Sequence, residues 1–118
     1  MRNFRHLELW REGMNLSLHV YRLTDNFPNN EEFGLKSQLR RASDSIPSNI
    51  SEGYSRNTNK GFIRFLERTL GSAYELETQI VLSKELDFIS EEKFQPLKES
   101  IDKLQGKLNA LRVAVKKQ

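Results

Sequence analysis

The apolar residues of this chain recur at helical rather than strand spacing along its whole length. No segment sustains the alternation of apolar and polar residues that marks a half-buried strand. Breaks at Pro28, at the Asn57–Asn59 stretch and near Ser90 instead separate segments with the three-and-four spacing of amphipathic helices. The pattern predicts helices at about residues 7–27, 35–55, 60–86 and 91–116.

The first segment carries two apolar stripes on nearly opposite sides. One stripe consists of Leu7, Trp10, Met14, Leu18 and Tyr21. The other consists of Leu9, Leu16, Val20, Leu23 and Phe27. A surface helix needs only one apolar face to join a core. We therefore expect one stripe to face the bundle and the other to contact either a further helix or another subunit. The surplus apolar surface favours the second alternative, a homo-oligomer.

The second segment keeps Pro47 inside an otherwise regular helical pattern. Its apolar face consists of Leu35, Leu39, Ala42, Ile46, Ile50 and Gly53. A proline in a helix interior removes a backbone hydrogen bond at a cost of about 3 kcal/mol, so we expect a kinked helix. Polar residues from Arg41 to Glu52 follow the edge of the face. They are expected to meet neighbouring helices, with Glu75 a candidate partner for Arg41.

The last two segments have clear start signals. Thr58 or Asn59 is the expected N-cap of the third helix, and Ser90 that of the fourth. Gly71 lies in the middle of the third segment, where glycine costs about 1 kcal/mol against alanine, so we expect a close helix approach there. Four long helices with short connections predict an all-α fold, an antiparallel up-down-up-down four-helix bundle that forms one domain over residues 1–118.

Composition narrows the class of protein. Of the 118 residues, 36% are apolar and 30% are charged, which is typical of a soluble globular domain. The chain has no cysteine, which excludes disulfides and thiol chemistry. No apolar run approaches the roughly 20 residues that cross a membrane, and the N-terminus lacks a signal-peptide pattern. We expect a cytoplasmic protein without a membrane partner.

Residues suited to catalysis are sparse. The two histidines, His6 and His19, are 13 positions apart, and neither follows a Glu-x-x pattern that would bind a metal on a helix. No serine has a histidine base in reach, and no glycine-rich phosphate loop follows a strand. We expect neither an enzyme nor a bound metal, cofactor or small-molecule substrate.

Charge is distributed unevenly along the chain. Its net charge is +3, but residues 34–68 hold seven bases against three acids, and residues 107–118 hold four bases and no acid. Helical spacing places Lys60, Arg64 and Arg68 in one row. Such rows of cations on a rigid face suit nucleic-acid phosphates. The candidate contact residues are Lys36, Arg40, Arg56, Lys60, Arg64 and Arg68.

Two readings of the basic residues remain open. In the first, they bind RNA or another nucleic acid. In the second, they form an ordinary solvated helix face, and the chain is a structural or protein-interaction module with no direct nucleic-acid contact. No aromatic residue is interleaved with the cations to stack on bases, unlike in many proteins that bind single strands.

Three runs of residues resemble a known family. They are Leu7-x-x-Trp10, then Phe33-Gly34-Leu35-x-x-Gln38-Leu39-Arg40-Arg41-Ala42, and then Ser45-Ile46-Pro47-x-Asn49-Ile50-x-Glu52-Gly53. The chain resembles, over about residues 4–110, the small proteins encoded in intervening sequences of bacterial 23S ribosomal RNA genes. It departs from the family pattern at Ser51, where alanine is commoner, and at Ala73, where leucine is expected.

The resemblance implies a four-helix bundle that assembles into a closed ring, usually a homopentamer. It also implies a role with RNA, because of where such proteins are encoded. A related bundle protein is an accessory factor of reverse transcriptases, which again points to nucleic acid. The resemblance supplies no catalytic residue.

Overall fold

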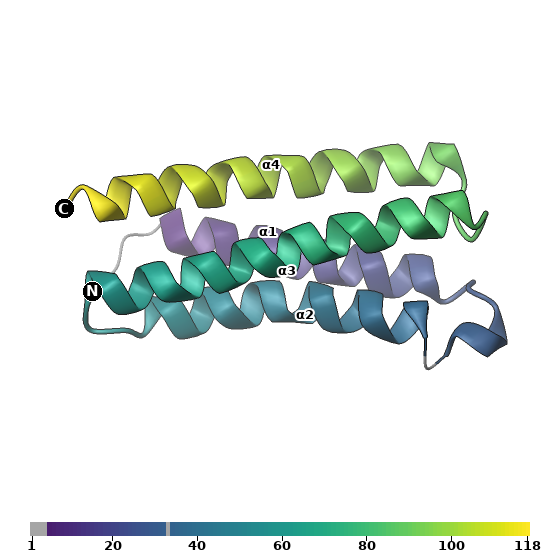
Figure 1. Cartoon of the computed structure of the whole chain (residues 1–118), viewed down its shortest axis with the longest axis horizontal. Coiled ribbons are helices and arrows are strands. Elements are labelled where there is room, and N and C mark those ends of the chain that lie inside the picture. The colour runs from purple at the N-terminus through teal and green to yellow at the C-terminus, as the bar shows by residue number, and fades with distance from the viewer. Residues whose placement is uncertain (1–4, 33) are drawn as a thin grey trace.

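A computed structural model describes the backbone of residues 5–32 and 34–118, and the side chains of 8–32 and 34–118. Figure 1 shows its four long helices, which are α1 (Arg5–Thr24), α2 (Leu35–Tyr54), α3 (Asn59–Glu85) and α4 (Glu91–Lys116). A short 3₁₀ helix, η1 (Asn29–Glu31), lies between α1 and α2. The described residues form no strand, so the prediction of an all-α, four-helix fold is confirmed.

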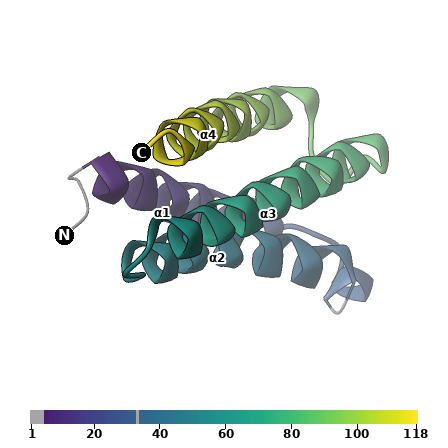
Figure 2. The same cartoon turned by 60° about the vertical axis from the view of Figure 1, so that its left-hand side comes forward.

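The chain reverses direction at each connection, as Figure 1 shows. The α1–α2 and α3–α4 connections lie at one end, and the α2–α3 connection lies with the last turn of α4 at the other. Helix α2 packs between α1 and α3, and α4 packs against α3 and less extensively against α1 (Figure 2). The molecule is elongated, 46 Å long and 24 by 19 Å across.

The core is built from one apolar face of each helix. It contains one of the two stripes of α1, with Leu9, Leu16, Val20 and Phe27 buried and Leu23 packed at the edge. The other stripe is exposed, so the prediction of two faces is confirmed for Trp10, Met14, Leu18 and Tyr21. The side chain of Leu7 lies outside the described residues.

Helix α1 ends at Thr24, three residues before the predicted end at Phe27. The Arg40 side chain gives a physical reason, because it satisfies acceptors at this helix end. Its Nε donates to Thr24 Oγ1 at 2.9 Å, and its Nη2 donates to the Tyr21 carbonyl at 3.1 Å. The backbone then turns, with the Phe27 amide donating to the Thr24 carbonyl at 3.0 Å.

Helices α2 and α3 approach each other closely at Gly53, whereas Gly71 lies at no such contact. A Cβ atom at Gly53 would lie 2.7 Å from the Cβ of Phe65, so only glycine fits without a shift. Gly71 is exposed and a Cβ there would meet nothing within 4 Å. The expectation of a close helix approach at Gly71 is therefore wrong.

Other local expectations have mixed outcomes. Thr58 and Ser90 are the N-caps of α3 and α4, and each hydroxyl accepts from the backbone amide three residues on. Helix α2 continues through Pro47, and its kink stays a prediction. Arg41 does not pair with Glu75, because within the described chain its side chain makes no ion pair and Glu75 accepts from Gln79 at 3.2 Å.

Candidate nucleic-acid interface

Four of the six predicted contact residues gather at one end of the bundle. Arg56 follows α2, and Lys60, Arg64 and Arg68 lie on the first half of α3. The last turns of α4 reach the same end (Figure 1) and add further cations there. We define the basic surface as these seven residues: Arg56, Lys60, Arg64, Arg68, Arg112, Lys116 and Lys117.

Two arginines of the basic surface are held in place by Phe65. The guanidinium carbon of Arg56 lies 4.6 Å from the centroid of the Phe65 ring, and that of Arg68 lies 4.7 Å from it. Cation–π contacts of this kind contribute about 0.5–1 kcal/mol each at exposed sites. Phe65 is buried beneath them, and its Cβ lies close to Gly53. The packing therefore pre-orients two charges that would otherwise be mobile.

A shallow hollow of about 470 Å³ lies between the start of α3 and the end of α4. Lys60, Arg64 and Glu67 line one wall, and Lys116 lines the other. At its outer edge, Asn59 Nδ2 donates to Gln118 Oε1 at 3.3 Å. Lys60 and Arg64 are exposed and form no ion pair with any described residue, so their charges are open to an anion.

The remaining two predicted contact residues lie at the opposite end of the bundle. Lys36 pairs with Glu32 at 2.9 Å, and Arg40 pairs with Asp25 at 2.9 Å. Arg40 also lies over the ring of Tyr21, 4.6 Å from its centroid, and caps α1. The structure thus gives these two cations intramolecular partners and separates them from the basic surface.

The α4 members of the basic surface were not among the predicted contact residues. Spacing along α4 alone cannot show which helix lies beside Arg112, Lys116 and Lys117. The acid-free charge of residues 107–118 was the available signal. The position of this segment beside α3 is visible only in the folded chain, where Glu67 contacts Arg112 and Lys116.

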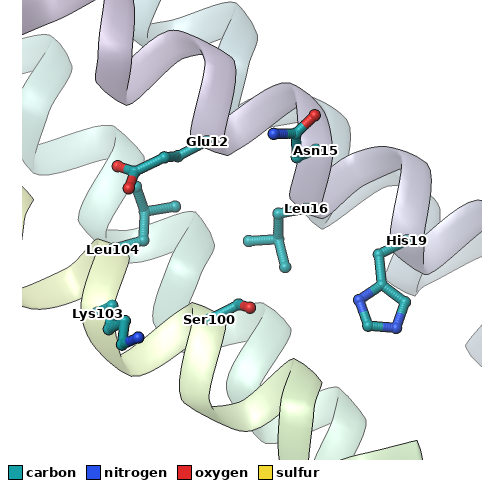
Figure 3. Close-up of a pocket in the computed structure, with 7 residues that line it drawn as sticks. All are labelled: Glu12, Asn15, Leu16, His19, Ser100, Lys103 and Leu104. Carbon is teal, nitrogen blue, oxygen red and sulfur yellow. The ribbon is translucent and has the colours of Figure 1, made fainter.

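A second hollow, of about 250 Å³, lies between α1 and α4 (Figure 3). Leu16 and Leu104 form its apolar part, and the His19 ring lies at one end. Burial, with the nearby charge of Arg22, lowers the pKa of His19.

The described residues include neither a cluster of metal-binding side chains nor a membrane-spanning helix. Residues 5–32 and 34–118 contain no cluster of three acidic or histidine side chains that could hold a metal ion. No helix among them is both long enough and apolar enough to span a bilayer.

The exposed stripe of α1 is a further surface feature. We call Trp10, Met14, Leu18 and Tyr21 the outer stripe; their exposed fractions lie between 36% and 46%. Tyr21 is fixed at its edge, because its hydroxyl donates to Asp44 Oδ2 at 2.7 Å. This hydrogen bond, with some burial, raises the pKa of Tyr21. The outer stripe is thus an ordered apolar surface that faces solvent.

Comparison with known proteins identifies the family. One similar solved structure is that of a protein of unknown function from the S23 ribosomal protein family of Bacteroides thetaiotaomicron VPI-5482. The two share 20% sequence identity with a TM-score of 0.80, over 88% of this chain and 97% of the other. This likeness shows the fold alone. No curated protein sequence matches the chain. The family model for the 23S rRNA-intervening sequence protein matches residues 5–110, and the chain therefore belongs to this family.

Proposed function

We propose that this protein binds RNA or another nucleic acid through the basic surface, without catalysing a reaction. The observation that carries the proposal is the convergence of two separate basic segments at one end of the bundle. Lys60 and Arg64 lie there without an intramolecular counter-ion among the described residues. The family name supports an RNA partner, because it refers to a sequence within ribosomal RNA.

The recognition expected from this surface is of backbone phosphates rather than bases. Lysine and arginine side chains on a rigid helix face neutralise phosphates and release counter-ions. Phe65, the ring over which Arg56 and Arg68 lie, is buried and cannot stack on a base. Affinity should therefore depend little on sequence and should fall steeply as salt is added.

The test compares a triple variant with one of equal charge change. Lys60, Arg64 and Arg68 are changed together to alanine, and the control changes the exposed residues Arg22, Lys93 and Lys103 to alanine. Binding of a labelled single-stranded RNA is measured by fluorescence anisotropy at several salt concentrations. The basic-surface variant should bind about tenfold more weakly or worse, with a shallower salt dependence, because three phosphate contacts are lost. The control should remain close to the unsubstituted protein.

Equal losses in the two variants would show that only total charge matters and would reject the basic surface as the site. Thermal unfolding of both variants checks that neither has lost its fold. A protein that binds no nucleic acid at low salt would instead support the second function, that of a protein-interaction module.

That second function has its own observation, which is the outer stripe. Four large apolar side chains in a row on a solvent-facing helix surface are typical of a contact with another protein chain. We propose that the partner is a second copy of this chain, in agreement with the homopentamer that the family resemblance implies. Self-association and nucleic-acid binding are compatible, because an oligomer repeats the basic surface and adds avidity.

A further inference from the structure

Glu67 is the acidic residue within the hollow between α3 and α4. Its Oε2 atom lies 3.5 Å from Arg112 Nη1 and 3.6 Å from Lys116 Nζ. Lys60 and Arg64 line the same hollow from α3. One carboxylate therefore lies among four cations that come from two helices.

The contacts of Glu67 are weak by their geometry. Strong charge-assisted hydrogen bonds between nitrogen and oxygen are about 2.7–2.9 Å long, and both contacts exceed this range. The side chains of Glu67 and Lys116 are about half exposed, so solvent screens their attraction. Arg112 also has a buried Nε with no acceptor among the described residues. The carboxylate of Glu67 thus pairs only weakly with Arg112 and Lys116 and leaves a donor of Arg112 without an acceptor among the described residues.

We infer that this hollow is a phosphate subsite and that Glu67 occupies it in the free protein. Lys60 and Arg64 from α3, with Arg112 and Lys116 from α4, hold one phosphate group of the bound strand. The carboxylate of Glu67 releases the two α4 cations to that phosphate. The inference rests on the proposed function for the identity of the ligand, a phosphodiester of nucleic acid.

Charge and spacing support this assignment. Lys60 and Arg64 are four residues apart, as are Arg112 and Lys116, so each pair spans about 6 Å along its helix. Lys60, Arg64 and Lys116 line the hollow, and Arg112 lies beside it in contact with Glu67, so all four cations can meet a phosphate drawn in from solvent. A phosphate offers several acceptor oxygens that a guanidinium can bind in pairs, whereas Glu67 meets Arg112 by one long contact.

The experiment removes the competing carboxylate. Glu67→Gln is compared with Glu99→Gln, which makes the same charge change on the exposed surface of α4, far from the hollow. Dissociation constants for single-stranded RNA are measured by fluorescence anisotropy at one salt concentration. Because an exposed ion pair contributes about 0.2–1 kcal/mol, Glu67→Gln should bind RNA about 1.4- to fivefold more tightly. Glu99→Gln should change the affinity by less.

A second probe tests the subsite without nucleic acid. Inorganic pyrophosphate is titrated into the unsubstituted protein and into Glu67→Gln, and lysine and arginine side-chain signals are followed by NMR. Signals of Lys60, Arg64, Arg112 and Lys116 should shift with a common dissociation constant, which should be lower in Glu67→Gln. Lys93, at the other end of the bundle, serves as the internal control.

The two probes separate failure of the inference from failure of the proposed function. If RNA binds but Glu67→Gln gains no more affinity than Glu99→Gln, the inference is overturned and the function stands. If pyrophosphate shifts none of the four signals, the inference is overturned whatever RNA does. If RNA does not bind while pyrophosphate shifts the four signals, more tightly in Glu67→Gln, the anion subsite stands and the nucleic-acid function fails.

Discussion

Phe65 and Gly53 show how single residues connect the core to the basic surface. The Phe65 ring lies under two guanidinium groups, and the Cβ of the same side chain lies close to Gly53. Because glycine lacks a side chain, α2 approaches α3 closely at this point and packs against the base of the Phe65 side chain. The positions of Arg56 and Arg68 therefore depend on a residue that carries no charge.

Replacing Gly53 by alanine should destabilise the fold. The added Cβ would lie 2.7 Å from the Cβ of Phe65, so the helices must separate at a cost of about 1–3 kcal/mol. Gly71→Ala is the matched control, because its Cβ has open space, and it should stabilise the helix by up to about 1 kcal/mol. Urea unfolding measures both variants. Equal changes of the same sign would contradict the close approach at Gly53.

Gly53 and Gly71 also mark what a sequence can and cannot predict here. The apolar spacing of Leu97, Ile101 and Leu104 determines their burial, because a helix turns by a fixed angle per residue. Helix number and the caps at Thr58 and Ser90 are equally local, and these expectations hold. Which glycine meets a neighbouring helix depends on packing between helices, and the expectation for Gly71 fails for this reason.

The candidate site, like the fold, was predictable from the sequence only where the residues belong to one helix. Lys60, Arg64 and Arg68 share a helix face, so their spacing alone predicts a row of cations. Arg40 has the same charge and a similar spacing from Lys36, but its role depends on the end of α1, which lies beside it only in the folded chain. The contribution of α4 to the basic surface is likewise a property of the fold.

At the scale of an element, the end of α3 contains a backbone conformation that suits glycine better than the residue present. Asp87 has a φ of 63°. The Phe88 amide donates to the Ser83 carbonyl at 2.9 Å, and the Asp87 amide donates to the Lys84 carbonyl at 3.0 Å. This pair of bonds is a Schellman motif, in which the left-handed residue is usually glycine. Phe88 then packs on Phe27, with ring centroids 5.4 Å apart.

We expect Asp87→Gly to stabilise the protein by about 0.5–1 kcal/mol, because glycine adopts the left-handed conformation without a steric penalty. Asp87→Ala should destabilise it, since alanine lacks the tolerance of aspartate for this conformation. Thermal unfolding measures both changes. Asp87→Asn is the control for charge: it should resemble the unsubstituted protein, and a gain equal to that of glycine would assign the effect to charge instead.

At the scale of the whole molecule, the outer stripe predicts the oligomeric state. Leu18→Glu places a charge within the stripe and should shift the protein toward a monomer, because burying an unpaired carboxylate in an interface is costly. Val113→Glu is the control, since Val113 is equally exposed, at 46%, on the outer surface of α4. Light scattering coupled to gel filtration measures the mass. A monomer of 13.8 kDa before any substitution would refute the assembly.

The two ends of the molecule differ in the sign of their net charge. The α1–α2 and α3–α4 connections share the end opposite the basic surface. In and beside them, the seven acids Asp25, Glu31, Glu32, Glu85, Asp87, Glu91 and Glu92 outnumber the five bases Arg22, Lys36, Arg40, Lys84 and Lys93. Separation of opposite charges along a 46 Å rod creates a permanent electric dipole along its long axis. A polyanion therefore exerts a torque on the protein before any contact forms, and turns the basic end toward itself. Encounters are oriented at low ionic strength, and this alignment fades as salt shortens the range of the field.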